Sequence, residues 1–205
     1  SDLISLTAFY KLIKNPISRI EVASAGGYLS YENIADKATV AGVEVEVRKN
    51  LFVRPLSSAA NGMNKLSFGL NGSYIYTNAK MPLATVTTGS QLEGAAPWIA
   101  NFDLSHNFTK GTHSFINTLV LNYVSDKIYT IGTQGYQDIM EQGMMTLDFV
   151  SQAKLNKYVS LTLKARNLLN PSYKLSRKAN ESGEKVVLSD YKKGINISLG
   201  VSCTF

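Results

Sequence analysis

Apolar and polar residues alternate along most of this chain, most regularly in its last segment, whose apolar positions are Ile195, Ile197, Leu199, Val201, Cys203 and Phe205. A period of two gives a β-strand one apolar and one polar face. About eight such segments are present, at residues 3–12, 38–50, 65–78, 96–108, 113–129, 145–155, 159–169 and 195–205. The pattern predicts an all-β protein, because no segment has the period of an amphipathic helix.

The connections between these segments differ in length in a regular way. Short ones fall at residues 109–112 and 156–157, and both suit tight hairpins. Long ones, rich in Gly, Ser, Asn and Lys, fall near residues 14–31, 79–94, 130–143 and 174–189. The link 51–64 is the exception, because the alternation of short and long connections predicts a short one here and the link is long. The alternation predicts an antiparallel up-and-down sheet with tight turns at one end and long loops at the other.

Periodicity alone does not distinguish a soluble barrel from a membrane barrel, whose apolar face contacts lipid. Most segments reach the nine to eleven residues that cross a bilayer, and membrane barrels share the loop asymmetry. Aromatic residues also gather at the two ends of the strands, as they do at membrane interfaces. At the long-loop ends these are Tyr10, Tyr74, Tyr76, Trp98, Tyr123, Tyr129, Tyr173 and Tyr191, and at the turn ends Phe68, Phe108, Phe115, Tyr158 and Phe205. These features favour a transmembrane barrel over a soluble barrel or sandwich.

The composition fits one β-rich domain, or a large piece of one, over residues 1–205, with 44% hydrophobic and 10% aromatic residues. No run of eighteen apolar residues and no signal peptide is present, and the chain begins inside a strand pattern without Met. We therefore expect a piece of a longer protein. The net charge of +6 does not indicate nucleic acid, because the basic residues lie mostly in predicted loops.

Candidate catalytic and metal sites are weak. His106 and His113 flank a short turn without further ligands at metal spacing, and Asp138 with Glu141 is a sparse cation set. The single cysteine, Cys203, lies on an apolar face, and no nucleophile or phosphate-binding motif is present. The sequence predicts neither an enzyme nor a cofactor.

Charged residues stand on the predicted polar face, which a membrane barrel turns toward its lumen. These are Glu44, Glu46, Arg48, Lys11 and Lys164. A hydrated barrel wall explains them, and a network of ion pairs with a lumenal domain is the functional alternative. Small residues on the same face would leave room for such a domain; they are Gly42, Gly69, Gly200 and Ser202.

Three short motifs carry a resemblance to a known family. Their residues are Ala38, Gly42, Glu44 and Glu46; then Pro97, Trp98, Asn101 and Leu104; then Asn167, Leu168, Leu169, Asn170 and Tyr173. In order and spacing, and with the terminal Phe205, they resemble the last third of the barrel of TonB-dependent outer-membrane receptors, most closely the Bacteroidetes branch. The resemblance spans nearly the whole chain.

The resemblance implies about eight strands of a barrel of about twenty-two in a Gram-negative outer membrane. Such receptors import scarce nutrients, and their partners are outer-membrane lipid, a plug domain inside the barrel and the TonB energising complex. This chain contains neither the plug nor the N-terminal segment that TonB grips. A substrate-capturing surface lipoprotein is a further partner in one branch, and Phe205 matches the family's assembly signal.

Two other functions stay open at this level. One is a self-contained eight-stranded barrel with a structural or adhesive role, which requires the first and last strands to pair. The other is a small barrel acting on lipid, for which the chain offers no convergent set of catalytic residues.

Overall fold

The structure is a computed structural model, and it describes residues 2–22, 28–56, 62–80, 91–133, 135–179 and 183–204. All regular structure in these residues is β. The strands are β1 (Leu3–Lys14), β2 (Ile17–Glu21), β3 (Leu29–Asn33), β4 (Lys37–Pro55), β5 (Met63–Ala79), β6 (Trp98–Lys110), β7 (His113–Val124), β8 (Lys127–Thr130), β9 (Ile139–Glu141), β10 (Met144–Lys154), β11 (Val159–Arg166), β12 (Ser172–Lys178), β13 (Lys185–Lys192) and β14 (Asn196–Cys203). Among the described residues, no helix is long and apolar enough to cross a membrane.

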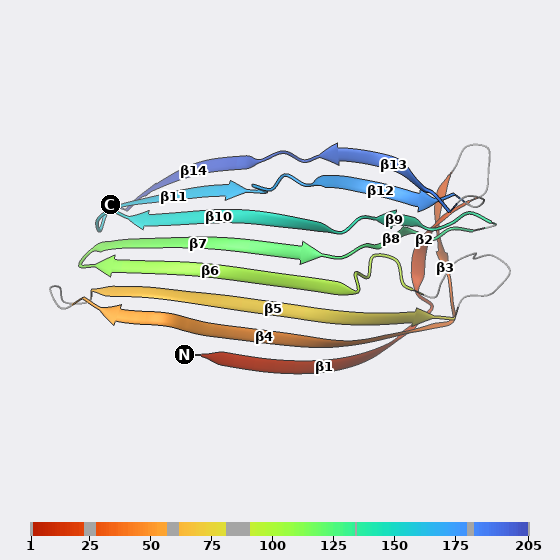
Figure 1. Cartoon of the computed structure of the whole chain (residues 1–205), viewed down its shortest axis with the longest axis horizontal. Coiled ribbons are helices and arrows are strands. Elements are labelled where there is room, and N and C mark those ends of the chain that lie inside the picture. Colours follow the sequence, from red (N-terminus) through yellow and green to blue (C-terminus); the bar gives the residue numbers. More distant parts are fainter. Residues whose placement is uncertain are drawn as a thin grey trace.

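Eight long strands form one antiparallel sheet in the order β1-β4-β5-β6-β7-β10-β11-β14. These strands match the eight segments predicted from the alternation, so the predicted all-β, up-and-down arrangement is confirmed. Figure 1 shows the tight turns at one end of the sheet, where both chain ends also lie, and the longer connections at the other. The hairpin between β6 and β7 closes at Lys110 and His113, which pair directly.

The paired registers place the apolar residues of neighbouring strands on one face. Leu6 pairs with Val45, and farther along the sheet Leu104 pairs with Leu119. The side chains on this face are open to the surroundings: Ile4 is 81% exposed, a very high value for an aliphatic residue. A continuous exposed apolar face of this size requires an apolar environment or a partner. The opposite face carries mainly polar residues. The apolar face is thus the exposed one, which is the reverse of the arrangement in a soluble protein, where apolar side chains are buried.

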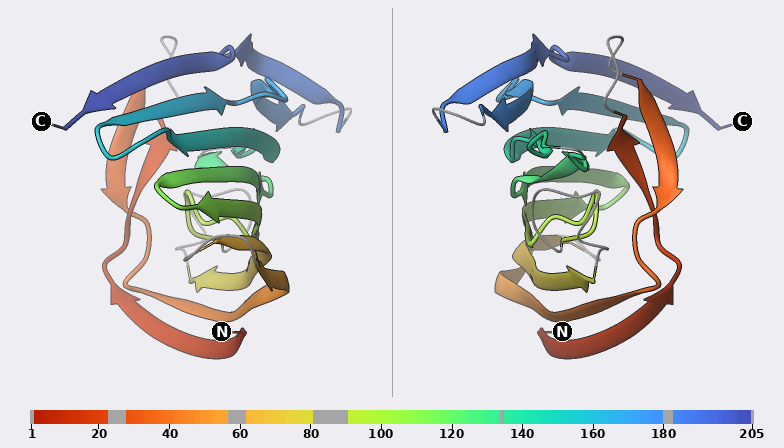
Figure 2. Two further views of the ribbon diagram at one scale, coloured as in Figure 1. Left: turned by 90° about the vertical axis from the view of Figure 1, so that its left-hand side faces the viewer. Right: turned by 90° about the vertical axis from the view of Figure 1, so that its right-hand side faces the viewer.

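The sheet is curved and open. Figure 2 shows its strands end-on as an arc, with β14 at one edge and β1 at the other. In the described part of the chain these two edge strands do not pair with each other. The pairing that a closed eight-stranded barrel requires is therefore absent from this structure.

The connections at the long-loop end contain strands, although the sequence pattern predicts loops there. β2 and β3 form a hairpin, and β13-β12-β9-β8 form a second sheet that continues beyond the first. The segment 113–129 is accordingly two strands, β7 and β8, separated at Ser125 and Asp126. The link 51–64 was also wrongly predicted, because β4 and β5 stay paired as far as Pro55 and Met63. Their register shifts once, between Asn50 and Phe52, so the extra length is strand with a bulge.

The β2–β3 hairpin crosses the concave side of the arc at the long-loop end (Figure 2). Its residue Ile20 belongs to the main buried cluster, together with Ala38 and Ala79 of the eight-stranded sheet and Ile128 and Ile131. Ala38 and Glu44 lie an even number of residues apart in β4, so the hairpin packs on the polar face. The concave face is therefore the polar face, and the convex face is the apolar one.

Candidate functional site

The β2–β3 hairpin is fixed to the chain that follows β8 by backbone hydrogen bonds. The Ile131 N–H donates to the Arg19 carbonyl at 3.0 Å, and the Glu21 N–H donates to the Ile131 carbonyl at 3.2 Å. Ile20 and Ile131 form a parallel bridge between them, and Ile131 is fully buried. A segment between β1 and β4 thus reaches across the concave side to a segment between β7 and β10, which lies four strands away in the sheet.

Two partly buried ion pairs also join the hairpin to segments distant in the sequence. Arg19 pairs with Glu93 at 3.2 Å, and its guanidinium lies 3.8 Å from the centre of the Tyr129 ring. Arg177 of β12 pairs with Glu21 of β2, and both side chains are less than a fifth exposed. Removing one partner of such a pair would leave a partly buried charge without its counter-charge. The hairpin is therefore a fixed part of the architecture and positions the wall of an adjacent pocket.

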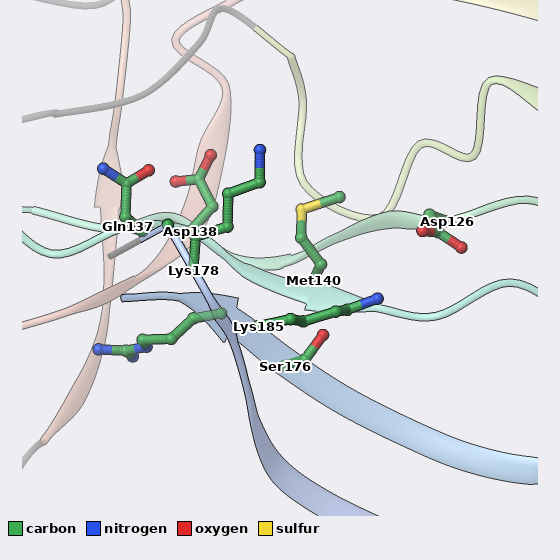
Figure 3. Close-up of a pocket in the computed structure, with 9 residues that line it drawn as sticks. Asp126, Gln137, Asp138, Met140, Ser176, Lys178 and Lys185 are labelled. Atoms are coloured by element: carbon green, nitrogen blue, oxygen red, sulfur yellow. The ribbon is translucent and has the colours of Figure 1, made fainter. Parts of the chain in front are cut away.

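That pocket lies at the long-loop end, with a volume of about 430 Å³. Figure 3 shows the side chains that line it, which come from β9, β12, β13 and the connections before and after β8 and between β12 and β13. They are Asp126, Gln137, Asp138, Met140, Ser176, Arg177, Lys178, Gly183 and Lys185. Ser176, Met140 and Ile128 stand in one row across β12, β9 and β8. Because Ile128 and Met140 pack with the hairpin cluster, the pocket is on the side that the hairpin covers.

The polar groups of the pocket are unequally satisfied. The Asp126 carboxylate accepts a hydrogen bond from the Gly143 N–H at 2.6 Å, and the Asp138 carboxylate accepts one from the Gly132 N–H at 2.8 Å. Ser176 is 1% exposed, and its hydroxyl has no hydrogen-bond partner among the described residues. Lys178 and Lys185 stand directly opposite each other across β12 and β13. The pocket therefore contains two acids that accept backbone hydrogen bonds and a buried hydroxyl without a partner among the described residues.

Next to the pocket, Glu141 of β9 is also engaged. Its carboxylate pairs with Lys127 at 3.3 Å and accepts a hydrogen bond from the Tyr173 hydroxyl at 3.2 Å. Burial, and after it the negative charge of Glu141, raises the pKa of Tyr173 to about 12. Tyr173 is outside the eight-stranded sheet and stays a neutral hydrogen-bond donor at ordinary pH. Glu141 is thus occupied by protein partners, and no group of three or more His, Cys, Asp or Glu in the described residues is placed to hold a metal ion.

The five charged residues predicted to face the lumen all stand on the polar face of the eight-stranded sheet. The structure brings two of them together, because Arg48 Nε lies 2.6 Å from Glu46 Oε1. Glu44, Lys11 and Lys164 form no ion pair within the described residues, although the Lys11 ammonium lies 5.5 Å from the Phe9 ring centre. Contact between these charges and a plug domain stays a prediction.

Small residues on the polar face do not all leave open space. A Cβ added at Gly42 would stand 2.7 Å from Phe9 Cε1 and 2.8 Å from the Tyr74 carbonyl oxygen. A Cβ at Gly69 would meet the carboxylate of Asp103, whose Cγ would be 3.1 Å away. The interpretation that these two glycines leave room for a lumenal domain is wrong, since side chains of the neighbouring strands already fill the space. Phe9, which pairs with Gly42, is an aromatic residue on the polar side of its strand and breaks the alternation there.

The predicted interfacial aromatics occupy several parts of the structure. Tyr74 and Trp98 are paired on the convex face with ring centres 4.6 Å apart. Phe68 pairs with Leu104, within the apolar face rather than beside the turn. On the convex face at the two strand ends stand Tyr10, Tyr76, Tyr123, Phe108 and Phe115, while Tyr158 adjoins the β10–β11 turn. Tyr173 and Tyr191 stack at 5.0 Å in the second sheet, and Phe205 lies outside the described residues.

A polar row interrupts the convex apolar face, and the sequence analysis missed it. His106, Asn117 and Ser151 pair in succession across β6, β7 and β10. The Ser151 hydroxyl donates to Asn117 Oδ1 at 2.7 Å, and His106 Nε2 lies 2.8 Å from Asn64 Oδ1. Each polar residue breaks the alternation of its own strand once, and only the register shows that the breaks coincide.

An open antiparallel sheet with a polar concave face and an exposed apolar convex face defines the wall of a membrane β-barrel. A family model described as "TonB dependent receptor-like, beta-barrel" matches residues 1–168. The chain belongs to this family of outer-membrane receptors and transporters, which are not enzymes. Comparisons with curated proteins and with solved structures give no match.

Proposed function

We propose that this chain forms part of the barrel wall of a TonB-dependent receptor that imports a scarce nutrient across the outer membrane of a Gram-negative bacterium. The observation that carries the proposal is the hairpin fixed across the concave polar face at the long-loop end. Together with the matched family, it provides a structured entrance on the water-filled side of a lipid-facing wall. The open edges of β1 and β14 provide pairing sites for further strands of a barrel of about twenty-two.

The roles of individual residues follow from this function. The convex aromatics lie at the two membrane interfaces, and Phe205 serves as the assembly signal. Glu44, Glu46, Arg48, Lys11 and Lys164 face the plug, and TonB acts through the receptor's N-terminal part. A Bacteroidetes-type receptor with a surface lipoprotein as substrate-capturing partner is the narrower form of this proposal.

Import is tested in cells of the source bacterium. A strain lacking the gene and a strain lacking TonB are grown on a panel of single sources of iron, cobalamin, haem, glycan and peptide. We expect at least one nutrient whose uptake fails in both strains and is restored by the intact gene. Uptake that is unchanged in the gene deletion for the entire panel would contradict the proposal.

The intact mass of the protein extracted from outer membranes tests the architecture. A chain of roughly 22-stranded size that contains this sequence supports the larger barrel. A mature protein near 22.4 kDa would instead support a self-contained barrel with a structural or adhesive role, which would need β1 and β14 to pair.

A further inference from the structure

Four polar side chains lie together on the convex face, close to the turn end of the sheet. His106, Asn117 and Ser151 pair in succession across β6, β7 and β10, and Asn64 of β5 joins them because its Oδ1 lies 2.8 Å from His106 Nε2. We call these four residues the polar patch. The rest of the face is mainly apolar and contacts lipid, where a polar side chain is unfavourable unless it is hydrogen-bonded.

The hydrogen bonds within the polar patch leave two amide groups without a partner. The Ser151 hydroxyl donates to Asn117 Oδ1 at 2.7 Å, and His106 Nε2 donates to Asn64 Oδ1. Both bonds use amide oxygens, so the side-chain N–H groups of Asn64 and Asn117 have no acceptor among the described residues. Water does not supply one within the hydrocarbon region of a bilayer. The polar patch therefore presents two donors that need an acceptor from the membrane.

The depth of the polar patch matches the ester groups of a phospholipid. In the placement that the proposed function implies, Phe108 lies at the turn-end interface, and His106 is two residues farther in, ~5 Å along the membrane normal. Short turns of such barrels are periplasmic, and the periplasmic leaflet of an outer membrane consists of glycerophospholipid. The ester carbonyl oxygens of these lipids lie at the border of the hydrocarbon region and accept hydrogen bonds.

Two basic residues adjoin the polar patch on the headgroup side. Arg54 of β4 pairs directly with Asn64, and Lys110 is the last residue of β6. Both are exposed, and neither forms an ion pair with a described residue. The Arg54 guanidinium lies 5.6 Å from the ring centre of Phe52, which stands on the same face. Two strands and two residues separate Arg54 from Lys110, ~12 Å between Cα positions, so their long side chains can reach one phosphate.

Acidic residues do not neutralise these charges. Strands β4, β5, β6, β7 and β10 are described throughout, and their acidic residues are Glu44, Glu46, Asp103 and Asp148. All four stand on the concave face. The convex face of these strands therefore carries positive charge at its turn end without an acid of its own, and it is complementary to an anionic membrane surface.

We propose that the polar patch, with Arg54 and Lys110, binds an anionic glycerophospholipid of the periplasmic leaflet. The two cations contact the phosphate, the side-chain N–H groups of Asn64 and Asn117 donate to the ester carbonyl oxygens, and apolar neighbours such as Leu66 contact the acyl chains. A phospholipid fits better than free phosphate, because the donors lie on an apolar surface that also accommodates acyl chains. The inference rests on the lipid-facing wall of the proposed function and does not depend on import.

Binding is measured by native mass spectrometry of the intact receptor released from detergent, with dioleoylphosphatidylglycerol as the anionic probe and dioleoylphosphatidylcholine as the zwitterionic one. The test variant is Arg54→Gln/Lys110→Gln. The matched control is Lys65→Gln/Lys154→Gln, which removes the same charge at the same end from the concave face. We expect the test variant to bind phosphatidylglycerol at least about tenfold more weakly, and the control to change its affinity less than about twofold.

Asn117→Val/Ser151→Ala separates the ester contacts from the charges. These two side chains are hydrogen-bonded to each other, so the double variant leaves neither partner unpaired. We expect its melting temperature in detergent without added lipid to stay close to that of the wild type. Its rise on adding phosphatidylglycerol should be smaller than the rise of the wild type. Heat-modifiable mobility in gels verifies that each variant is folded.

Several results would overturn the proposal. They are equal binding of phosphatidylglycerol by the wild type and the Arg54/Lys110 variant, an equal loss in the concave control, an undiminished thermal rise in the Asn117/Ser151 variant, and no lipid retained by the wild type. A second protein retained on this face in place of lipid would also overturn it. Specific lipid binding without TonB-dependent uptake would contradict the import function and leave the lipid site intact.

Discussion

An arginine on the convex face of β7 should destabilise the barrel, whereas an arginine one residue later should not. Leu119 and Val120 are neighbours in this strand and point to opposite faces. Leu119 stands on the apolar face, and Val120 stands between Asp103 and Asp148 of the adjacent strands. Leu119→Arg and Val120→Arg therefore introduce the same side chain into the same strand and differ in the face that receives it.

The geometry of β6 places Leu119 near the middle of the membrane. Trp98 and Phe108 are ten residues apart, which corresponds to ~25 Å along the membrane normal at ~3.3 Å per residue and ~40° tilt. This equals the usual height of the apolar band of such barrels. Leu104, the partner of Leu119, lies six residues from Trp98 and four from Phe108. An arginine at this depth costs about 2–4 kcal/mol. An arginine at position 120 would form a hydrated ion pair with Asp103 or Asp148, which contributes about 0–1 kcal/mol of stabilisation.

The assay is urea unfolding of the intact receptor in phospholipid vesicles, followed by tryptophan fluorescence, together with the yield of heat-modifiable protein in outer membranes. We expect Leu119→Arg to lower both, and Val120→Arg to stay within about 1 kcal/mol of the wild type. Leu119→Ala serves as the control for lost apolar contact alone. Equal losses for the two arginine variants, or a larger loss for Val120→Arg, would refute the assignment of the convex face to lipid.

Three further outcomes are expected. Gly42→Ala should lower the stability of the barrel by about 1–3 kcal/mol in the same urea assay, because its Cβ would lie 2.8 Å from a backbone oxygen. Gly72→Ala should have little effect, because a Cβ there would have no atom within 4 Å. Similar losses for both variants would argue against close packing on the concave face. Asn117→Val and Ser151→Ala should each destabilise the barrel, because each leaves the other polar side chain unpaired. The double variant should recover most of the loss. If the two single losses simply add in the double variant, the residues are not coupled through their 2.7 Å hydrogen bond. Ultraviolet titration against Tyr173→Phe should show one tyrosine ionising at about pH 12. Because its pKa is raised in the folded state, the stabilisation is complete below about pH 10 and is lost as pH rises through 12, and a midpoint near 10 would contradict the burial of Tyr173.

The sequence by itself determined the eight long strands and which residues share a face. Alternation is a local property: a period of two assigns Leu119 and Val120 to opposite faces whatever the partner strands are. It also determined the order of the sheet, because tight turns such as Lys110 to His113 force sequential strands to pair. Alternation therefore identifies the apolar face of the sheet, and the curvature of the sheet in the structure shows that this face is the convex one.

Local pattern was insufficient in the connections. The strands Ile17–Glu21 and Ile139–Glu141 are too short to show a clear period of two, so the sequence pattern predicts loops at these positions. The link 51–64 misled because the bulge near Leu51 shifts the alternation by one residue, although the pairing continues on both sides.

Only the tertiary structure decided what lies on the concave face. Arg177 pairs with Glu21 across 156 positions, and Arg19 meets Glu93 across 74, because the β2–β3 hairpin folds back over the sheet. Strand register likewise places the Phe9 ring in the space beside Gly42 and sets Lys178 opposite Lys185. Register and fold-back are set by contacts between distant segments, and a sequence pattern specifies the face of each residue without specifying which residues meet there.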